Sequence, residues 1–513
     1  MVLNLNNKFL IIFTLFILGI FSSYSLPPYN FFFINFITFP LLFYILVNNI
    51  NKNFLSLFFY GWIFGFGYFL SNLYWISNSL KFDENFEGLI ILSIVFIPFL
   101  LSFYYGIFSI CLKFLNVRLN FHSILIFALT LSVVEYLRGN FFGGFPWNLI
   151  TYSILELTSS LQILNLIGTY SLNLIIITFY CLPIVLTFNI SKFRKFAIFL
   201  LAFTIILINS YYGNNRIKDI AQTKKKLIVQ PIKLISPNFK IERFFIDEPI
   251  EKKLNELIQI SYPLDKDSLL IYPEGITNIG ELNGLGNDFS EISNLIYGNS
   301  KIILGITFDD GEKIFNSLAL FNKNFELEDK YDKNKLVPFG EFLPFEKILS
   351  NFGLKKITSG YKSFSSSNER NIINVNSVSF LPVICYEIIF SGQLSNNNDY
   401  DFILNISEDG WFGNSIGPFQ HFSHSVFRSI EEGKDVLRVA NNGISAHIKL
   451  NGTIEKKLNS TDKGSIEIDS ISRAIPTLFS VYGNKIFFFL VFFYISLIFF
   501  LKKKYEKKLF IHK

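Results

Sequence analysis

The sequence predicts a multi-span α-helical membrane protein that carries a layered α/β domain outside the bilayer. Half of the 513 residues are hydrophobic and 63 are phenylalanine, a composition too apolar for an ordinary water-soluble protein. The apolar residues gather into long runs toward both ends of the chain. From about residue 214 to 484, charged residues, Asn, Ser and Gly return, together with short β-rich runs.

Eight apolar runs with few charges are the candidate membrane spans. Crossing a bilayer takes about 20 apolar residues, with roughly 17 to 25 as the usual range, so most runs are long enough and the last is slightly short. The first run lacks a following small-x-small cleavage pattern, so we expect a span and not a cleaved signal peptide. The runs cover residues 9–26, 31–47, 54–76, 89–115, 121–137, 161–188, 196–211 and 486–501.

Basic residues predict the orientation, because Lys and Arg near span ends stay on the cytoplasmic side. Lys8, Lys52, the pair Lys113 and Arg118, residues 191–195 and residues 502–508 fall on alternate connections. An odd number of spans then delivers the central region to the outside. The predicted organisation is a membrane domain at 1–212, an outer domain at 213–484, a span at 485–501 and a basic cytoplasmic tail at 502–513.

The net charge of +6 comes largely from that tail. We interpret it as a topology signal that also holds the terminus to an anionic membrane surface, and we expect no nucleic-acid partner.

The outer region alternates β-rich runs with helix-like segments, which favours a layered α/β domain. Several of the strand candidates are apolar throughout, as expected of strands covered on both faces. The strand candidates are 225–232, 268–275, 301–308, 315–322, 378–387, 401–407 and 445–451, and the helix candidates are 248–262 and 422–440.

Ionisable groups stand where three of these β-rich segments end. Glu274 lies between Pro273 and Gly275, Lys333 and Lys335 precede Glu341 in a loop punctuated by Gly and Pro, and Cys385 ends an apolar strand. A thiol, an amine and a carboxylate are the parts of an acyl-transfer site: a nucleophile, a cation for the oxyanion and a base for the proton. Each part alone is more often core packing or a solvated loop.

Two other groups of residues receive a simpler interpretation. Cys111 and Cys181 lie in apolar runs and are expected to pack as small hydrophobes, which leaves Cys385 without a disulfide partner in an oxidising compartment. His421 and His424 have an i, i+3 spacing that could hold zinc, but neither they nor His447 belong to a completed ligand pattern. We therefore expect no metal and no cofactor.

The motifs "YPEG", "YDKNKLVPFGEFLP" and "PVICYE" resemble the Glu, Lys and Cys motifs of the nitrilase superfamily. The "NISEDGWFGNSIGPFQH" block (405–421) and the seven-plus-one spans are similar to bacterial apolipoprotein N-acyltransferases. This resemblance implies a nitrilase-like α-β-β-α sandwich on the periplasmic side of the inner membrane.

The resemblance also implies roles for individual residues. Glu274 matches the general base, Lys333 the oxyanion stabiliser and Cys385 the nucleophile. Glu341 matches a second glutamate that orients the site, and Tyr386 and Glu387 match supporting residues that follow the nucleophile.

Three aromatic residues match substrate-binding positions of the family. Trp411 and Phe412 match a loop that borders the acyl pocket, and Trp147 matches a segment at the lipid entry, although an interfacial aromatic anchor explains Trp147 equally well. One departure is that no tryptophan follows Gln230 and Pro231, where relatives often carry one.

The implied reaction transfers a fatty acyl group from a membrane phospholipid, through a Cys385 thioester, to the α-amine of the N-terminal diacylglyceryl-cysteine of an apolipoprotein. We expect a monomer. Two alternatives stay open: a membrane-tethered nitrilase-like amidase, and a non-catalytic transporter or scaffold. The scarcity of ionisable residues in the spans disfavours a transporter, and the exceptions, Glu135 and Arg138, are expected to pair locally.

Overall fold

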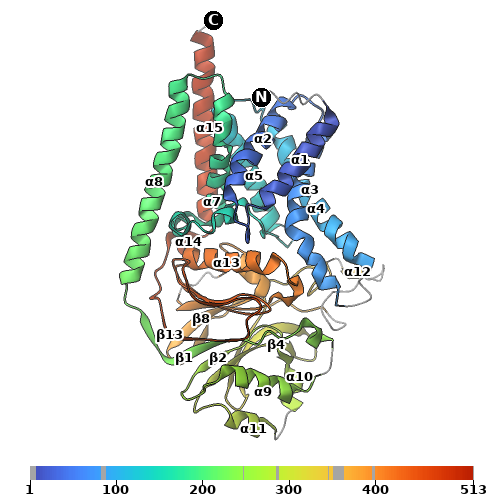
Figure 1. Ribbon diagram of the computed structural model, residues 1–513, viewed down its shortest axis with the longest axis vertical. Helices are drawn as coiled ribbons and strands as arrows, with labels where there is room; N and C mark the ends of the chain where they lie inside the picture. The colour runs from blue at the N-terminus through green and yellow to red at the C-terminus, as the bar shows by residue number, and fades with distance from the viewer. Residues whose placement is uncertain are drawn as a thin grey trace. The chain divides into compact units, whose positions relative to one another are not determined.

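The computed structural model describes residues 7–82, 88–141, 143–245, 248–284, 288–344, 346–349, 363–394 and 399–511 (Figure 1). The chain divides into two compact units. The helical unit comprises residues 1–77, 88–217 and 482–513, and the sandwich unit comprises residues 78–87 and 218–481.

Each of the eight apolar runs forms a helix of the helical unit. Among the described residues, six helices are long and apolar enough to cross a membrane, and the two nearest the N-terminus are shorter. The fold class is therefore confirmed, with the number of spans close to the predicted eight. The elements are α1 (Lys8–Ser23), η1 (Phe32–Ile34), α2 (Asn35–Asn48), α3 (Phe54–Leu73), η2 (Tyr74–Leu80), α4 (Ile90–Phe114), α5 (Phe121–Asn140), η4 (Ile150–Ile154), α6 (Thr158–Leu161), α7 (Leu164–Cys181), η5 (Leu182–Thr187), α8 (Lys192–Gln222) and α15 (Lys485–Ile511).

Glycines allow the first helices of this unit to pack closely. A Cβ on Gly19 of α1 would lie 2.1 Å from the carbonyl oxygen of Phe64 in α3, and a Cβ on Gly61 of α3 would lie 2.2 Å from that of Tyr105 in α4. Small residues at such crossings let helix backbones approach one another in a membrane.

The two charged residues of α5 pair with each other, as expected. Arg138 donates from Nε to the Glu135 carboxylate at 2.8 Å, and both side chains are buried. A second guanidinium nitrogen reaches Asn148 at 3.2 Å. This arrangement explains how the helix carries two charges inside an apolar unit.

The sandwich unit contains two sheets packed face to face between helices (Figure 1). One sheet has the order β13 (Gly464–Ile471), β1 (Lys226–Ser236), β2 (Leu269–Ile271), β4 (Lys301–Asp309), β5 (Ile314–Asn322), β6 (Leu327–Asp332), with β3 (Thr277–Asn278) beside β4. The other has the order β12 (Ile454–Leu458), β11 (Ser445–Ile448), β10 (Asp435–Asn441), β9 (Phe402–Glu408), β8 (Val378–Ile384), β7 (Ile373–Val375).

Helices cover the outer faces of both sheets and complete the α-β-β-α sandwich (Figure 1). α9 (Ile250–Ser261) packs on the first sheet in one apolar cluster, and α13 (Gly417–Glu432) lies on the second. A separate cluster between the sheets joins Leu234 and Ile303 to Phe380 and Phe402. The other helical elements are η6 (Ile241–Phe244), α10 (Ile279–Gly284), α11 (Asp288–Asn294), α12 (Glu346–Leu349), η8 (Cys385–Ile389), η9 (Asp409–Phe412) and α14 (Leu478–Tyr482).

Strand direction decides where the polar side chains gather. β1, β2 and β4 are mutually parallel, and two antiparallel pairings through β5 make β6 parallel to them. β8, β9 and β10 are also parallel. The residues that follow β2 and β6 therefore lie at the same end of the strands of the first sheet. Those that follow β8 and β9 lie at the same end of the strands of the second.

The predicted helix at 422–440 is wrong in its last part. α13 ends at Glu432, Gly433 takes a positive φ of 64°, and the chain enters β10. Gly is the residue that most readily ends a helix in this left-handed conformation. All seven residues of β10 are buried, so the strand lacks the alternation that separates a strand from a helix in sequence.

Candidate active site

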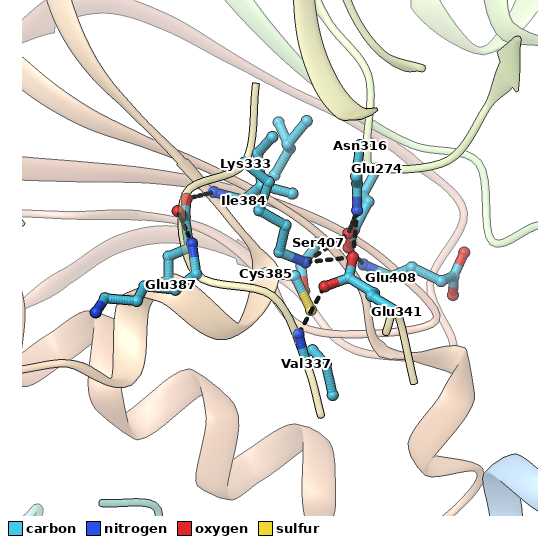
Figure 2. A network of polar contacts seen from close by, with 12 residues as sticks. Glu274, Asn316, Lys333, Val337, Glu341, Ile384, Cys385, Glu387, Ser407 and Glu408 are labelled. Atoms are coloured by element: carbon cyan, nitrogen blue, oxygen red, sulfur yellow. Dashed lines mark hydrogen bonds and ion pairs between the residues drawn. The ribbon is translucent and has the colours of Figure 1, made fainter. Parts of the chain in front are cut away.

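The structure brings together four predicted site residues at the ends of β strands. Glu274 lies three residues after β2, Lys333 directly follows β6 and Cys385 directly follows β8. Figure 2 shows these side chains and that of Glu341 converging on one point. All four are buried, with Cys385 the most exposed at 8%.

Lys333 binds both carboxylates at this point. Its Nζ lies 3.2 Å from Oε1 of Glu274 and 2.9 Å from Oε1 of Glu341. Burial alone would lower the pKa of Lys333, but the two carboxylates outweigh it and hold the pKa well above its usual value. The ammonium is therefore charged at neutral pH and could stabilise negative charge on a neighbouring atom.

Asn316 completes this arrangement, and no sequence motif indicated it. Its side-chain amide, from β5, donates to Oε1 of Glu274 and to Oε1 of Glu341, each at 2.7 Å. Main-chain N–H groups hold the other oxygens: Glu408 donates to Glu274 at 2.9 Å and Val337 to Glu341 at 2.8 Å. Both carboxylates are thus fixed in place.

Cys385 has an unusual backbone conformation, with φ at 48°. A non-glycine residue in this left-handed region costs of order 1–3 kcal/mol and is typical of functional sites. The conformation turns the chain sharply from β8 into η8 and places the thiol at the strand end. Burial and the carboxylates of Glu274 and Asp409 raise the pKa of the thiol, against the opposing effect of Lys333. The thiol is therefore neutral at rest, and a base would be needed to turn it into a nucleophile.

Glu387 links the nucleophile strand to the turn that carries Lys333. One oxygen accepts from the main-chain N–H of Asn334 at 2.9 Å and Lys335 at 3.1 Å, and the other accepts from Ile384 at 2.8 Å. An ion pair with Arg370 holds the pKa of this buried carboxyl below its usual range. Glu387 thus ties the main chain beside Lys333 to the main chain beside Cys385.

Comparison with known proteins agrees with this geometry. The model of the apolipoprotein N-acyltransferase N-terminal domain matches residues 18–182, and the model of the carbon-nitrogen hydrolase matches residues 293–474. An apolipoprotein N-acyltransferase of Rickettsia typhi is 30% identical over 94% of this chain and 98% of its own length, and that of Rickettsia prowazekii is 30% identical over the same shares. The chain belongs to the apolipoprotein N-acyltransferase family.

This membership makes the chain an acyltransferase and a membrane protein. The apolipoprotein N-acyltransferase of Rhodopseudomonas palustris is 29% identical over 91% of this chain. Among solved structures, a CN-hydrolase superfamily protein from Xanthomonas campestris matches 47% of this chain and 90% of its own, with 16% identity and a TM-score of 0.34.

The aromatic residues predicted at the acyl pocket of this acyltransferase lie in η9, which directly follows β9. The Trp411 ring stacks on Phe244 with centroids 5.4 Å apart, and Phe82 meets it edge-on at 6.0 Å. Phe412 packs edge-on against His421 at 5.6 Å. Phe244 in η6 is thus an aromatic partner of Trp411. The tryptophan that relatives often carry after Gln230 and Pro231 is absent from this chain.

Tyr386 and Trp147 are both buried, in different units of the acyltransferase. The Tyr386 ring packs against Phe390 at 5.2 Å. In the helical unit, Trp147 is 2% exposed and packs against Trp75 at 4.9 Å and Phe145 at 6.1 Å. The suggested role of Trp147 at the lipid entry stays a prediction.

Two histidines of the acyltransferase lie against buried carboxylates. His421 lies 2.8 Å from Asp409, and His447 lies 2.8 Å from Asp435. Within the part of the chain that the structure describes, no group of three His, Cys, Asp or Glu side chains is placed to hold a metal ion.

Proposed function

We propose that this acyltransferase moves a fatty acyl group from a membrane phospholipid to the α-amine of the N-terminal diacylglyceryl-cysteine of an apolipoprotein, through a thioester on Cys385. The observation that carries the proposal is the buried thiol at a strand end beside Lys333, which is itself held between Glu274 and Glu341. The names of the relatives, apolipoprotein N-acyltransferases, supply the acceptor and the kind of transfer, and the site supports the chemistry.

The first half-reaction begins with the neutral thiol. Glu274 accepts the thiol proton as Sγ of Cys385 attacks the ester carbonyl of the phospholipid, and the Lys333 ammonium stabilises the negative charge on the carbonyl oxygen. The tetrahedral intermediate collapses with breakage of the ester C–O bond. Glu274 returns the proton to the leaving oxygen, so a lysophospholipid departs and an acyl thioester is left.

The second half-reaction uses the same groups in turn. The free α-amine of the acceptor attacks the thioester carbonyl, Glu274 takes a proton from the attacking nitrogen, and Lys333 again stabilises the oxyanion. Breakage of the C–S bond releases the amide product, and the proton passes to Cys385. The thiol and the carboxylate are restored, which makes this a ping-pong cycle.

Glu341 and Glu387 support this cycle without taking the proton. Glu341 shares the positive charge of Lys333, and Glu387 fixes the turn on which Lys333 stands. We assign Trp411 and Phe412 to the border of the acyl pocket.

The proposed location is the bacterial inner membrane, with the sandwich unit on the periplasmic side and the enzyme acting as a monomer. Alternate connections rich in Lys and Arg support this orientation. The apolar helices support a lipid substrate, because both donor and acceptor are held in the bilayer by their acyl chains.

A transfer assay separates this reaction from hydrolysis of the thioester by water. The purified full-length protein is incubated with phospholipid and a synthetic peptide that begins with diacylglyceryl-cysteine. Mass spectrometry then measures the masses of the products. The matched control is the same peptide with its α-amine acetylated. An acyl group gained by the free-amine peptide alone supports the proposal. Free fatty acid with no acylated peptide would instead identify a hydrolase.

A further inference from the structure

A fully buried histidine contacts the main chain of Cys385, and the reaction above does not use it. Nε2 of His421, from α13, lies 3.2 Å from the carbonyl oxygen of Cys385. Nδ1 of the same ring lies 2.8 Å from Oδ1 of Asp409 and 3.1 Å from a guanidinium nitrogen of Arg438. That guanidinium nitrogen also donates to Oδ2 of Asp409 at 2.8 Å. The imidazole is thus held at one nitrogen and reaches Cys385 with the other.

The contact between His421 and Cys385 has a fixed direction. A carbonyl oxygen only accepts hydrogen bonds, so Nε2 is the donor. Burial and the Arg438 guanidinium lower the pKa of His421, so the ring is neutral at pH 7 and its one proton lies on Nε2. Nδ1 then accepts from Arg438, whose charge offsets that of Asp409 beside it. A second proton at lower pH would go to Nδ1 and donate to Asp409, so Nε2 keeps its bond in either state.

The backbone of Cys385 is where such a bond matters, because its φ is 48°. A non-glycine residue keeps this left-handed conformation only where the surrounding structure holds it. Before Cys385, the pairing of β8 with β9 fixes the chain up to Ile384. After it, His421 binds the peptide group that contains the Cys385 carbonyl. The residue that carries the thiol is therefore held on both sides.

We propose that His421 is a positioning residue, which donates from Nε2 to the Cys385 carbonyl and so holds the turn that places the thiol beside Glu274 and Lys333. In this role the ring exchanges no proton with the substrate. Asp409 and Arg438 fix the tautomer, because the partners of one ring nitrogen decide which nitrogen carries the proton. This inference rests on Cys385 being the nucleophile of the proposed function.

A small activated ester tests this role without a phospholipid. When Sγ of Cys385 attacks p-nitrophenyl acetate, the thiol proton passes to Glu274, the ester C–O bond breaks, an acetyl thioester forms and p-nitrophenolate is released. The rate of the first-turnover burst of p-nitrophenolate, measured on the full-length protein in detergent, reports how well the thiol is placed. Cys385→Ala supplies the background from Cys111 and Cys181.

Two amide variants separate the roles of the two ring nitrogens. The amide nitrogen of Gln is as many bonds from Cα as Nε2 of His is, and the amide nitrogen of Asn is as many bonds away as Nδ1. We therefore expect His421→Gln to keep a burst rate close to that of the parent. His421→Asn and His421→Leu are expected to slow the burst by about tenfold or more, because a small displacement of a reacting group costs much of its rate.

The matched control is His447→Asn. His447 is also buried and lies 2.8 Å from the carboxylate of Asp435, at the start of β10. This variant is expected to lower the melting temperature and to keep the burst rate of the parent. It separates a loss of stability from a loss of positioning.

Two results would overturn the proposal: a leucine variant that is as fast as the parent, or a glutamine variant that is no faster than the asparagine variant. Gel filtration and a thermal melt check that each variant is folded, and the amide pair decides the question if His421→Leu does not fold. A parent that shows the burst but takes no acyl group from phospholipid would contradict the proposed function alone.

Discussion

Arg370 and Glu387 form an ion pair of 2.7 Å in the interior of the sandwich unit, where Glu387 is fully buried. The same carboxylate accepts main-chain hydrogen bonds from Asn334, next to Lys333, and from Ile384, next to Cys385. One side chain thus links the main chain next to Lys333 with the main chain next to Cys385.

Glu387→Gln is expected to lower stability and acylation together. The neutral amide leaves Arg370 as a buried charge without its partner, which typically costs about 3–5 kcal/mol. Loosening of the turn that carries Lys333 is expected to slow acyl-enzyme formation by at least an order of magnitude. A thermal melt and a time course of adduct mass measure the two effects.

The matched control for this variant is Glu369→Gln, which removes an exposed carboxylate beside Arg370. It is expected to melt and acylate like the parent. Equal behaviour of the two variants would show that Glu387 does not hold the site together.

Asn316 offers a second test, because its amide bridges Glu274 and Glu341 at 2.7 Å each. Asn316→Leu removes two hydrogen bonds to charged groups and is expected to slow acylation by about tenfold or more. Asn316→Asp places a third carboxylate beside the one ammonium, so its rate is expected to fall further. If the leucine variant acylates at the rate of the parent, the bridge has no part in catalysis.

The site residues that lie within motifs could be predicted from the sequence alone. Glu274, Glu341 and Cys385 each stand beside Pro, Gly or an apolar strand, and Lys333 lies in the same long motif as Glu341. The structure gathers all four. Their motifs are local, so a single sequence displays them.

Asn316 and the network around Asp409 could not be found in this way. Asn316 is one polar residue in an apolar strand, and only the pairing of β5 with its neighbours reveals what it faces. Asp409, His421 and Arg438 come from η9, α13 and β10, so their meeting depends on the packed fold. β6 was missed because Leu327–Asp332 is mostly charged and exposed, as suits an edge strand.

Glu432 at the end of α13 predicts a pH effect on stability. Burial and the neighbouring Glu431 carboxylate raise the pKa of Glu432 from 4.5 to about 7. Between these values the folded chain keeps a proton that the unfolded chain releases, so this contribution to stability is complete below pH 4.5 and is lost as pH rises through 7. Glu432→Gln removes this loss. The gain in stability of the variant over the parent is therefore expected to be about 3 kcal/mol larger at pH 8 than at pH 5.

Thermal melts of both proteins at pH 5 and pH 8 check this expectation. The control is Glu431→Gln, because Glu431 pairs with Arg428 at 2.8 Å and accepts from Ser391 at 2.8 Å. That variant is expected to lower the melting temperature at both pH values. A stability gain of Glu432→Gln that is the same at pH 5 and pH 8 would refute the raised pKa.

Intact-mass spectrometry shows whether Cys385 carries the acyl group during the reaction. The purified protein is incubated with phospholipid alone, with Cys385→Ala alongside. We expect the parent to gain the mass of one fatty acyl group, which neutral hydroxylamine removes, and the variant to gain nothing. Folded parent protein that transfers acyl groups to acceptor yet never gains this mass, or a variant that still gains it, would contradict this role of Cys385.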